Sequence, residues 1–297
     1  MKFRTEYQAE KAPFSFDPKK PVVLLGSCFA QNMAAKMSMY GMQPCLPAGT
    51  LYNPDSIATA VEIMGDTENS SQRFKDSLFL SNGLWNSWGF DSSFSSPIRD
   101  NCIKEFEIRR DEFLDTIEKG QQVIVTFGTS ICYYIEEGSK AVGNCHKQPA
   151  NQFFTRRLSL YQITDSWNEL LQKWKVRYPD LKVIFTVSPV RHLKDGFVAN
   201  SRSKAVLQLA VEEICRNNPA AGYFPAYEIL NDDLRDYRFY ASDLAHPSEE
   251  AIEYIWEKFV ETYFDTDGKK ELEEGLRNYK AAHHRPKTGA LGLPLHP

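Results

Sequence analysis

The stretch Val22-Val23-Leu24-Leu25-Gly26-Ser27-Cys28-Phe29-Ala30 decides the fold of this chain. Its four consecutive apolar residues indicate a strand that is buried on both faces. Residues 29–39 (FAQNMAAKMSM) are good helix formers and predict a helix directly afterwards. This order places Ser27 at the carboxyl edge of a sheet, where ligands bind in α/β folds. The same position also suits a serine that only caps the helix.

Further apolar runs alternate with helical patterns along the chain, which is the signature of a parallel sheet. We expect strands at 22–26, 43–46, 121–127, 182–187 and 222–224. We expect helices at 29–39, 55–64, 110–119, 156–177, 203–217 and 248–263. The predicted fold is a three-layer α/β/α sandwich around a parallel sheet of about five strands.

Two segments depart from this alternation. Residues 73–108 are rich in aromatic residues, Ser, Asn and Gly, and Ser81-Asn82-Gly83 is typical of a hairpin turn. Residues 265–297 begin with a highly charged stretch and end in a segment with several Pro and Gly. We therefore expect one domain over residues 1–264 with a β-hairpin insertion at 73–108, followed by a charged helix and a tail over 265–297.

The composition limits the partners of the chain. Of its 297 residues, 42% are hydrophobic and 25% are charged, which argues against disorder. The net charge of -4 gives no reason to expect a nucleic acid or an anionic membrane as a partner. No run of about 18 apolar residues predicts a spanning helix, and the first residues lack the apolar core of a signal peptide. We expect a cytoplasmic protein, although an exported protein after removal of its signal would look the same.

The six cysteines are at positions 28, 45, 102, 132, 145 and 215, without the C-x-x-C spacing of a zinc ribbon or a thioredoxin-like site. Reduced thiols are the better expectation in the absence of a secretion signal. We therefore predict no metal and no cofactor. The oligomeric state is left open by the sequence.

A second informative segment is Asp243-Leu244-Ala245-His246, in which an acid precedes a histidine by three residues. One loop can then supply both a general base and the group that orients it. With Ser27 these residues would form a hydrolase triad, in which His246 deprotonates Ser27 and Asp243 fixes the imidazole tautomer. The alternative for the segment is a capping turn before the helix at 248–263. Cys28 is a rival nucleophile at a helix N-terminus, but a buried small residue is the favoured interpretation for it.

The chain resembles the GSCFA family, whose name is the pentapeptide Gly26-Ser27-Cys28-Phe29-Ala30. Further segments similar to that family are Gly49-Thr50-Leu51-Tyr52-Asn53-Pro54, Phe127-Gly128-Thr129-Ser130, Asn144-Cys145-His146-Lys147, Ser188-Pro189-Val190-Arg191-His192, and Asp236-Tyr237-Arg238-Phe239-Tyr240 leading into Asp243 and His246-Pro247-Ser248. They run in order from about residue 21 to residue 264, and His284-Arg285-Pro286 would extend the match. One pentapeptide alone is weak evidence, whereas six segments in order are strong evidence.

This family is in turn similar to the SGNH hydrolases, also called GDSL-type esterases. That resemblance implies a flavodoxin-like sheet and a site made of a Ser, a Gly, an Asn and an Asp-x-x-His. Ser27, Asp243 and His246 match these motifs, but the first motif lacks the Asp that the superfamily has between its Gly and Ser. The third motif, usually Gly-x-Asn-Asp, is at best Gly128-Thr129-Ser130 and contains no Asn. The source of the oxyanion donor is therefore open.

Candidates for that donor are the backbone N–H of Ser27, Gly49, Asn53, Asn144 and His146. The loop at 138–150 follows the third strand, so we expect it to fold back over the sheet edge and bring Asn144 or His146 near Ser27. Ordinary alternatives are a turn at Gly49 and a loop stabilised by its own side-chain-to-backbone hydrogen bonds.

Arg191 and His192 directly follow the strand at 182–187, so they should lie at the same sheet edge and bind substrate. The alternative for them is a structural ion pair. The aromatic side chains of the insertion could stack on a sugar ring, although such residues more often pack a hairpin onto its domain. They are Trp85, Trp88, Phe90 and Phe94.

Together these observations predict an ester hydrolase that removes an acyl group from a small-molecule or glycan ester, for example acetyl from a carbohydrate. An acyltransferase with the same triad would differ only in the final acceptor. A non-catalytic binding protein on a hydrolase fold is the third interpretation, because fold does not imply function. The missing third-motif Asn favours that third interpretation.

Overall fold

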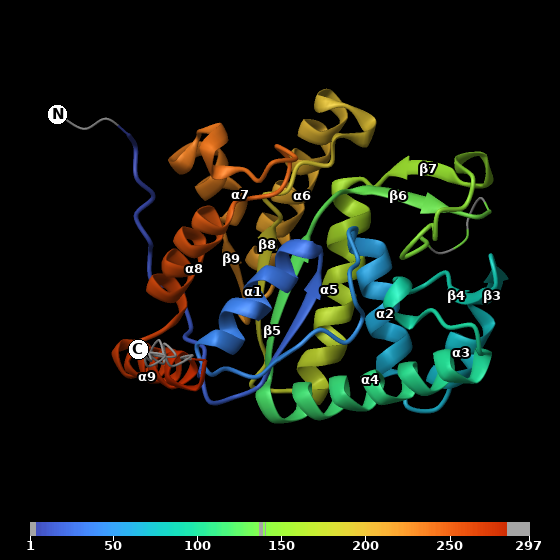
Figure 1. Cartoon of the computed structure of the whole chain (residues 1–297), viewed down its shortest axis with the longest axis horizontal. Helices are drawn as coiled ribbons and strands as arrows, with labels where there is room; N and C mark the ends of the chain where they lie inside the picture. Colours follow the sequence, from blue (N-terminus) through green and yellow to red (C-terminus); the bar gives the residue numbers. More distant parts are fainter. Residues whose placement is uncertain (1–3, 137–138, 140, 284–297) are drawn as a thin grey trace, which may run out of the picture.

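A parallel five-stranded sheet forms the centre of the computed structural model, which describes residues 4–136, 139 and 141–283. Its strands are β1 (Val22–Gly26), β2 (Pro44–Cys45), β5 (Gln122–Phe127), β8 (Lys182–Val187) and β9 (Ala221–Phe224). They lie in the order β2-β1-β5-β8-β9, and every neighbouring pair is parallel (Figure 1). This confirms the predicted sheet, and the order is the flavodoxin-like one.

Helices cover both faces of the sheet (Figure 1). Along β1, Val23 and Leu25 belong to one buried cluster, and Val22 and Leu24 belong to another. The first cluster includes side chains of α2 (Pro54–Gly65), α4 (Arg99–Gly120), α5 (Leu160–Arg177) and α6 (Phe197–Asn217), and the second includes side chains of α1 (Cys28–Met39), α8 (Glu249–Tyr263) and α9 (Thr266–Ala282). Because successive side chains of a strand point to opposite faces, a fully apolar strand requires this three-layer arrangement.

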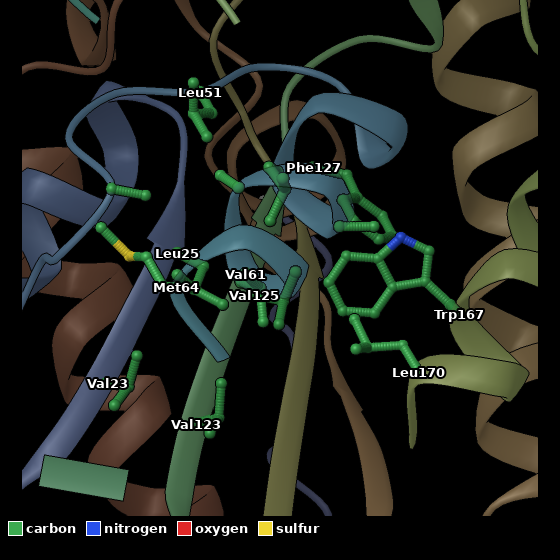
Figure 2. Packing of buried hydrophobic residues seen from close by; sticks show 14 of the residues in the cluster. Val23, Leu25, Leu51, Val61, Met64, Val123, Val125, Phe127, Trp167 and Leu170 are labelled. Atoms are coloured by element: carbon green, nitrogen blue, oxygen red, sulfur yellow. The ribbon is translucent and has the colours of Figure 1, made fainter. Parts of the chain in front are cut away.

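Trp167 of α5 connects the core to the segment that begins α2 (Figure 2). Its ring packs edge-on against Phe127 and Phe185, with centroid separations of 5.1 and 5.3 Å. Its indole N–H donates a hydrogen bond of 3.2 Å to the carbonyl of Pro54. The ring is thus buried with its polar atom satisfied, and it fixes the start of α2, which borders the candidate site.

The insertion contains the predicted hairpin but is shorter than expected. Strands β3 (Leu78–Ser81) and β4 (Leu84–Ser87) pair in antiparallel fashion around Asn82 and Gly83, which have φ values of 51° and 76°. The following helix α4 begins at Arg99 rather than at residue 110, and a short helix α3 (Ser70–Asp76) precedes the hairpin. The first turns of α4 contain mostly charged residues. Only Cys102 and Phe106, which are buried and four residues apart, carry the spacing of a helix there.

The aromatic residues of the insertion pack within it. This agrees with the alternative that such residues pack a hairpin onto its domain. Phe90 and Phe94 are buried, and both rings contact Phe74 of α3. Trp88 stacks on Phe79 with a centroid separation of 3.6 Å. Trp85 is partly buried against the main core. These contacts use the rings to hold the hairpin onto the domain.

A second hairpin was not predicted. It consists of β6 (Ile131–Tyr134) and β7 (Phe154–Arg157), which flank the loop expected at 138–150, and β7 includes the first two residues of the helix expected at 156–177. All four residues of β7 are exposed, so the strand carries no alternation of apolar and polar residues. Helix α5 consequently begins at Leu160 rather than 156, where Ser159 and Gln162 form a capping box.

Other boundaries differ by a few residues. Helix α6 begins at Phe197 rather than at 203, and residues 226–239 form short helical turns: α7 (Ala226–Glu228), η4 (Ile229–Leu234) and η5 (Tyr237–Phe239). The charged helix expected after residue 265 is α9, whereas the rest of the tail, with the segment 284–286, lies outside the described residues. Within residues 4–136, 139 and 141–283, we find no helix with the length and hydropathy needed to cross a membrane.

We predict that Gly26→Ala destabilises the protein by roughly 2–5 kcal/mol. Gly26 has a φ of +127°, and a Cβ at this position would lie 2.1 Å from the carbonyl oxygen of Thr126 in the adjacent strand. Urea denaturation measures the loss. Gly65→Ala is the matched control, because nothing lies within 4 Å of its added Cβ. Equal stability of Gly26→Ala and the wild type would contradict the close approach of β1 and β5.

Candidate active site

Ser27 lies between β1 and α1, at the point where the strand order of the sheet reverses. Ligands bind at this switch point in open α/β sheets. Ser27 is the N-cap residue of α1, yet within the described chain its side chain makes no capping hydrogen bond. The Oγ atom is fully enclosed and has no hydrogen-bond partner among the described residues. A buried polar atom without a partner is costly, so the helix cap does not explain this serine.

Asp243 and His246 form a hydrogen-bonded pair in the loop before α8. His246 Nδ1 lies 2.5 Å from Asp243 Oδ2, as predicted. The second carboxylate oxygen, Oδ1, accepts hydrogen bonds from the backbone N–H of His246 and of Ala245, at 3.0 and 2.9 Å. The backbone bonds from His246 and Ala245, followed by the bond from the imidazole, lower the pKa of Asp243 to about 2. The carboxylate is therefore charged and holds the ring with Nε2 free.

The loop that carries this pair lies near residues that surround Ser27. The carbonyl of Ala245 accepts a hydrogen bond of 3.1 Å from the N–H of Arg191, which follows β8. His246 contributes to the lowered pKa of His192, and Asp243 contributes to the raised pKa of Cys28. Ser27 Oγ and His246 Nε2 are not hydrogen-bonded to each other. Catalytic hydrogen bonds are often long in free enzymes and tighten when substrate binds.

Cys28 has the environment of a structural thiol. It is the first residue of α1 and is partly buried. Burial is the main cause of its raised pKa, and the nearby Asp243 raises the pKa further. The helix N-terminus and Lys204 oppose this effect without reversing it. The thiolate needed for a cysteine nucleophile is therefore disfavoured.

The second-motif segment docks against the end of β1 through its backbone. The N–H of Leu51 donates to the carbonyl of Gly26 at 2.9 Å. The N–H of Gly49 reaches the carbonyl of Leu46 at 3.5 Å, and the N–H of Thr50 donates to Asp91 Oδ2 at 2.7 Å. The backbone N–H of Ser27 donates to the carbonyl of Thr126 at 3.3 Å. The predicted backbone donors at Ser27 and Gly49 are thus both engaged within the sheet edge.

A cavity of about 240 Å³ lies at this edge. Its lining includes Tyr52, Asn53, Tyr133, Val142, Asn144 and His192. Tyr52 and His192 also border Gly128, beside which Ser27 lies. Asn53 caps α2, because its Oδ1 accepts the N–H of Ser56 at 2.8 Å. This bond leaves the amide NH₂ of Asn53 uncommitted to the cap.

The loop with Asn144 and His146 lies at the predicted sheet edge, but its two side chains differ. Asn144 lines the cavity, and its Oδ1 accepts the N–H of His146 at 2.8 Å. His146 Nε2 instead lies 2.7 and 3.1 Å from the carbonyls of Ser87 and Phe90, and burial lowers its pKa. The ring of His146 is therefore bound to the hairpin insertion and is not among the residues that line this cavity.

Arg191 and His192 follow β8 and diverge from each other. The guanidinium of Arg191 lies over the ring of Tyr240 at 4.6 Å, and among the described residues it forms no ion pair. The imidazole of His192 is half-buried with its Nε2 atom enclosed, and it packs edge-on against Tyr52 with a centroid separation of 5.4 Å. Burial, then Lys204, then His246 lower the pKa of His192 to about 4. The structural ion-pair alternative thus applies to neither residue.

Lys204 of α6 was missed by the sequence analysis. Its side chain is buried, and Nζ donates to the carbonyls of Gly128 and Ser188 at 2.7 and 2.6 Å. No carboxylate pairs with it among the described residues, and burial lowers its pKa to about 7. The spacing of Lys204 from Leu207 and Val211 places it on the buried face of α6, and this was the available signal.

The described residues contain no candidate metal site. Within the residues that the structure describes, no three His, Cys, Asp or Glu side chains are placed to hold a metal ion. All six cysteines lie in this part of the chain and are free.

Comparison with known proteins identifies the family. The GSCFA family matches residues 21–259, and no curated protein matches the chain. One similar solved structure is a carbohydrate esterase of family 3 from Talaromyces cellulolyticus, with 11% identity over 86% of this chain and 98% of that chain and a TM-score of 0.32. Another is a serine-to-alanine mutant of an acetyl esterase with acetate ion, with 12% identity over 87% of this chain and 99% of that chain and a TM-score of 0.32. Likeness at this level does not bear on the reaction.

We predict that Lys204 makes stability depend on pH between about 7 and 10. Its pKa falls from 10.5 to about 7 in the folded chain, so the unfolded chain binds more protons in this window. Stability therefore rises with pH through Lys204, by up to about 1.4 kcal/mol per pH unit, and Lys204→Met removes this rise. Urea denaturation of both proteins at several pH values gives the difference.

Lys258→Met is the matched control for this experiment. Burial lowers the pKa of Lys258, but its ion pairs with Glu261 and Glu6 raise the pKa on balance. Its contribution to stability should be constant from pH 7 to 9.5. The difference in unfolding free energy between the wild type and Lys204→Met is the quantity to compare across pH. If it does not change with pH, the pKa of Lys204 is not lowered in the folded chain.

Proposed function

Because this chain belongs to the GSCFA family, we propose that it is a serine esterase in which Ser27, His246 and Asp243 act as nucleophile, base and orienting acid. One observation carries the proposal. The hydroxyl of Ser27 is enclosed at the switch point of the sheet, makes no capping bond to α1 and has no hydrogen-bond partner among the described residues. The hydrogen-bonded pair of His246 and Asp243 in the adjoining loop supports it. An imidazole oriented in this way would activate a serine that comes within hydrogen-bond reach of its Nε2.

The proposed reaction begins when His246 Nε2 takes the proton of Ser27 as Oγ attacks the ester carbonyl. Asp243 keeps Nδ1–H of His246 in place and stabilises the imidazolium that forms. The carbonyl oxygen becomes an oxyanion near the N-terminus of α1, where the partial positive charge of the helix favours it. Collapse of the intermediate returns the proton to the leaving alcohol. Water then attacks the acyl-enzyme by the same route and releases the acid.

The cavity borders Gly128 next to Ser27, although Ser27, Asp243 and His246 do not line it, and its size and lining are those expected for a small acyl ester. Its volume of about 240 Å³ lies below the roughly 300–1,000 Å³ of pockets that enclose drug-sized ligands. Aromatic and aliphatic side chains, Tyr52, Tyr133 and Val142, line it together with the amides Asn53 and Asn144. An acetyl or similarly short acyl group on a polar alcohol such as a sugar fits this mixture. An acyltransferase would use the same residues with another acceptor.

We predict that Ser27→Ala and His246→Ala each remove nearly all hydrolysis of a chromogenic acetate ester without unfolding the protein. Asp243→Asn should be severe as well, because it upsets the imidazole tautomer. The three residues act as one unit, so Ser27→Ala combined with His246→Ala should be little worse than either alone. The kcat of each purified variant, with its urea midpoint, is the measurement.

Cys28→Ala is the control and should keep wild-type turnover. Mass spectrometry after treatment with a serine-directed organophosphonate should find the adduct on Ser27. Full activity in Ser27→Ala together with loss in Cys28→Ala would move the chemistry to the thiol. A wild-type protein that neither hydrolyses esters nor takes up the phosphonate would favour the non-catalytic alternative.

A further inference from the structure

We propose that the imidazole of His192, as a neutral hydrogen-bond donor, stabilises the oxyanion in place of the Asn that the third motif lacks. The inference rests on the proposed function, because it takes Ser27 as the nucleophile. It concerns a group that would touch the reacting oxygen, so it assigns His192 a catalytic role rather than a purely structural one.

The third-motif segment itself offers no free donor. The N–H groups of Gly128 and Thr129 both donate to the carbonyl of Tyr52, at 2.8 and 2.9 Å. The N–H of Ser130 donates to Ser203 Oγ at 2.7 Å, and the hydroxyl of Thr129 lies 3.0 Å from the same oxygen. Every polar group that could stand in for the missing Asn at this segment is thus already bound to the fold.

His192 follows β8, which β5 separates from β1, and it reaches the neighbourhood of Ser27 beside Gly128. A Cβ on Gly128 would lie 2.9 Å from His192 Nε2 and 3.4 Å from the Cβ of Ser27. The space next to the Cα of this glycine is therefore bordered by both the imidazole and the serine. The Nε2 atom is enclosed and, among the described residues, has no hydrogen-bond partner. An unsatisfied buried polar atom costs about 1–3 kcal/mol, which a developing oxyanion would offset during the reaction.

The ring is held in place before substrate arrives. The backbone N–H of His192 donates to the buried side chain of Asn200 in α6 at 3.0 Å, and the ring edge packs against Tyr52. A donor fixed in this way needs no reorganisation in the transition state, which is the main requirement for stabilising an oxyanion.

The two histidines near Ser27 lie in opposite electrostatic environments. His246 is paired with the carboxylate of Asp243, which suits a residue that must carry a proton. His192 has no carboxylate partner among the described residues and lies near the buried Lys204. Burial and that charge lower the pKa of His192 to about 4, so the ring is neutral at pH 7. An imidazole with so low a pKa is a poor base, but it can still donate one hydrogen bond.

The test compares three substitutions that separate the donor from the ring. His192→Phe keeps a ring against Tyr52 but has no N–H, and His192→Leu is a second variant without a donor. Each should lower kcat by about 10²–10³-fold with little change in KM. His192→Gln, whose amide N–H can occupy the place of Nε2, should retain at least roughly tenfold more activity than His192→Phe, because one donor accounts for about 10²-fold.

The pH profile provides a second measurement. All three variants should keep the wild-type shape of the kcat/KM profile, because the base His246 is untouched. His283→Leu removes a histidine that follows α9 and does not line the cavity, and it should leave kcat within about threefold of wild type. Urea midpoints show which variants are folded.

The outcomes separate this inference from the proposed function. If folded His192→Phe and His192→Leu keep wild-type kcat while Ser27→Ala is inactive, the esterase proposal survives and the role of His192 is refuted. If His192→Gln is as impaired as His192→Phe, the ring is structural and the donor assignment is also refuted. If Ser27→Ala keeps full activity, the proposed function itself fails.

Discussion

The close approach of β1 and β5 at their carboxyl ends is the constraint on which the candidate site depends. Gly26 has no side chain and a positive φ, and only these properties allow its Cα to lie against the carbonyl of Thr126. The same carbonyl accepts the N–H of Ser27, while the carbonyl of Gly26 accepts the N–H of Leu51. One backbone junction therefore fixes the serine, the start of α1 and the segment that leads into α2. The position of Ser27 is set by the sheet and not by a loop.

The buried ammonium of Lys204 adds an electrostatic constraint to this geometry. It binds the carbonyls that end β5 and β8, so these two strands leave the sheet in fixed directions. A charge in a dry environment is costly, and here it also disfavours a second positive charge on His192. On the exposed side of the site, His246 Nδ1 is hydrogen-bonded to the carboxylate of Asp243. The two imidazoles therefore have different charged neighbours, an ammonium for His192 and a carboxylate for His246.

The two hairpins decide the shape of the cavity. The β3–β4 hairpin holds the loop that follows β6, because Gly143 donates to the carbonyl of Trp88 and His146 binds the carbonyls of Ser87 and Phe90. Asn144 then remains on the cavity side of the loop. The insertion therefore contributes to the site through its backbone, which explains why its aromatic side chains are used for packing.

The sequence by itself determined the features that depend on local pattern. Apolar runs located β1, β5 and β8, because a strand that is buried on both faces is apolar along its whole length. The spacing of Asp243 and His246 sufficed for their pairing, because three residues span a single turn. Only the tertiary structure decided the rest. Strand β7 is exposed and α4 begins in charged residues, so neither carries a periodic signal there. The approach of His192 to Gly128 comes from packing between segments far apart in the chain, which no local pattern records. The spacing of α6 places Lys204 on the buried face, but only the fold brings its Nζ to the ends of two strands.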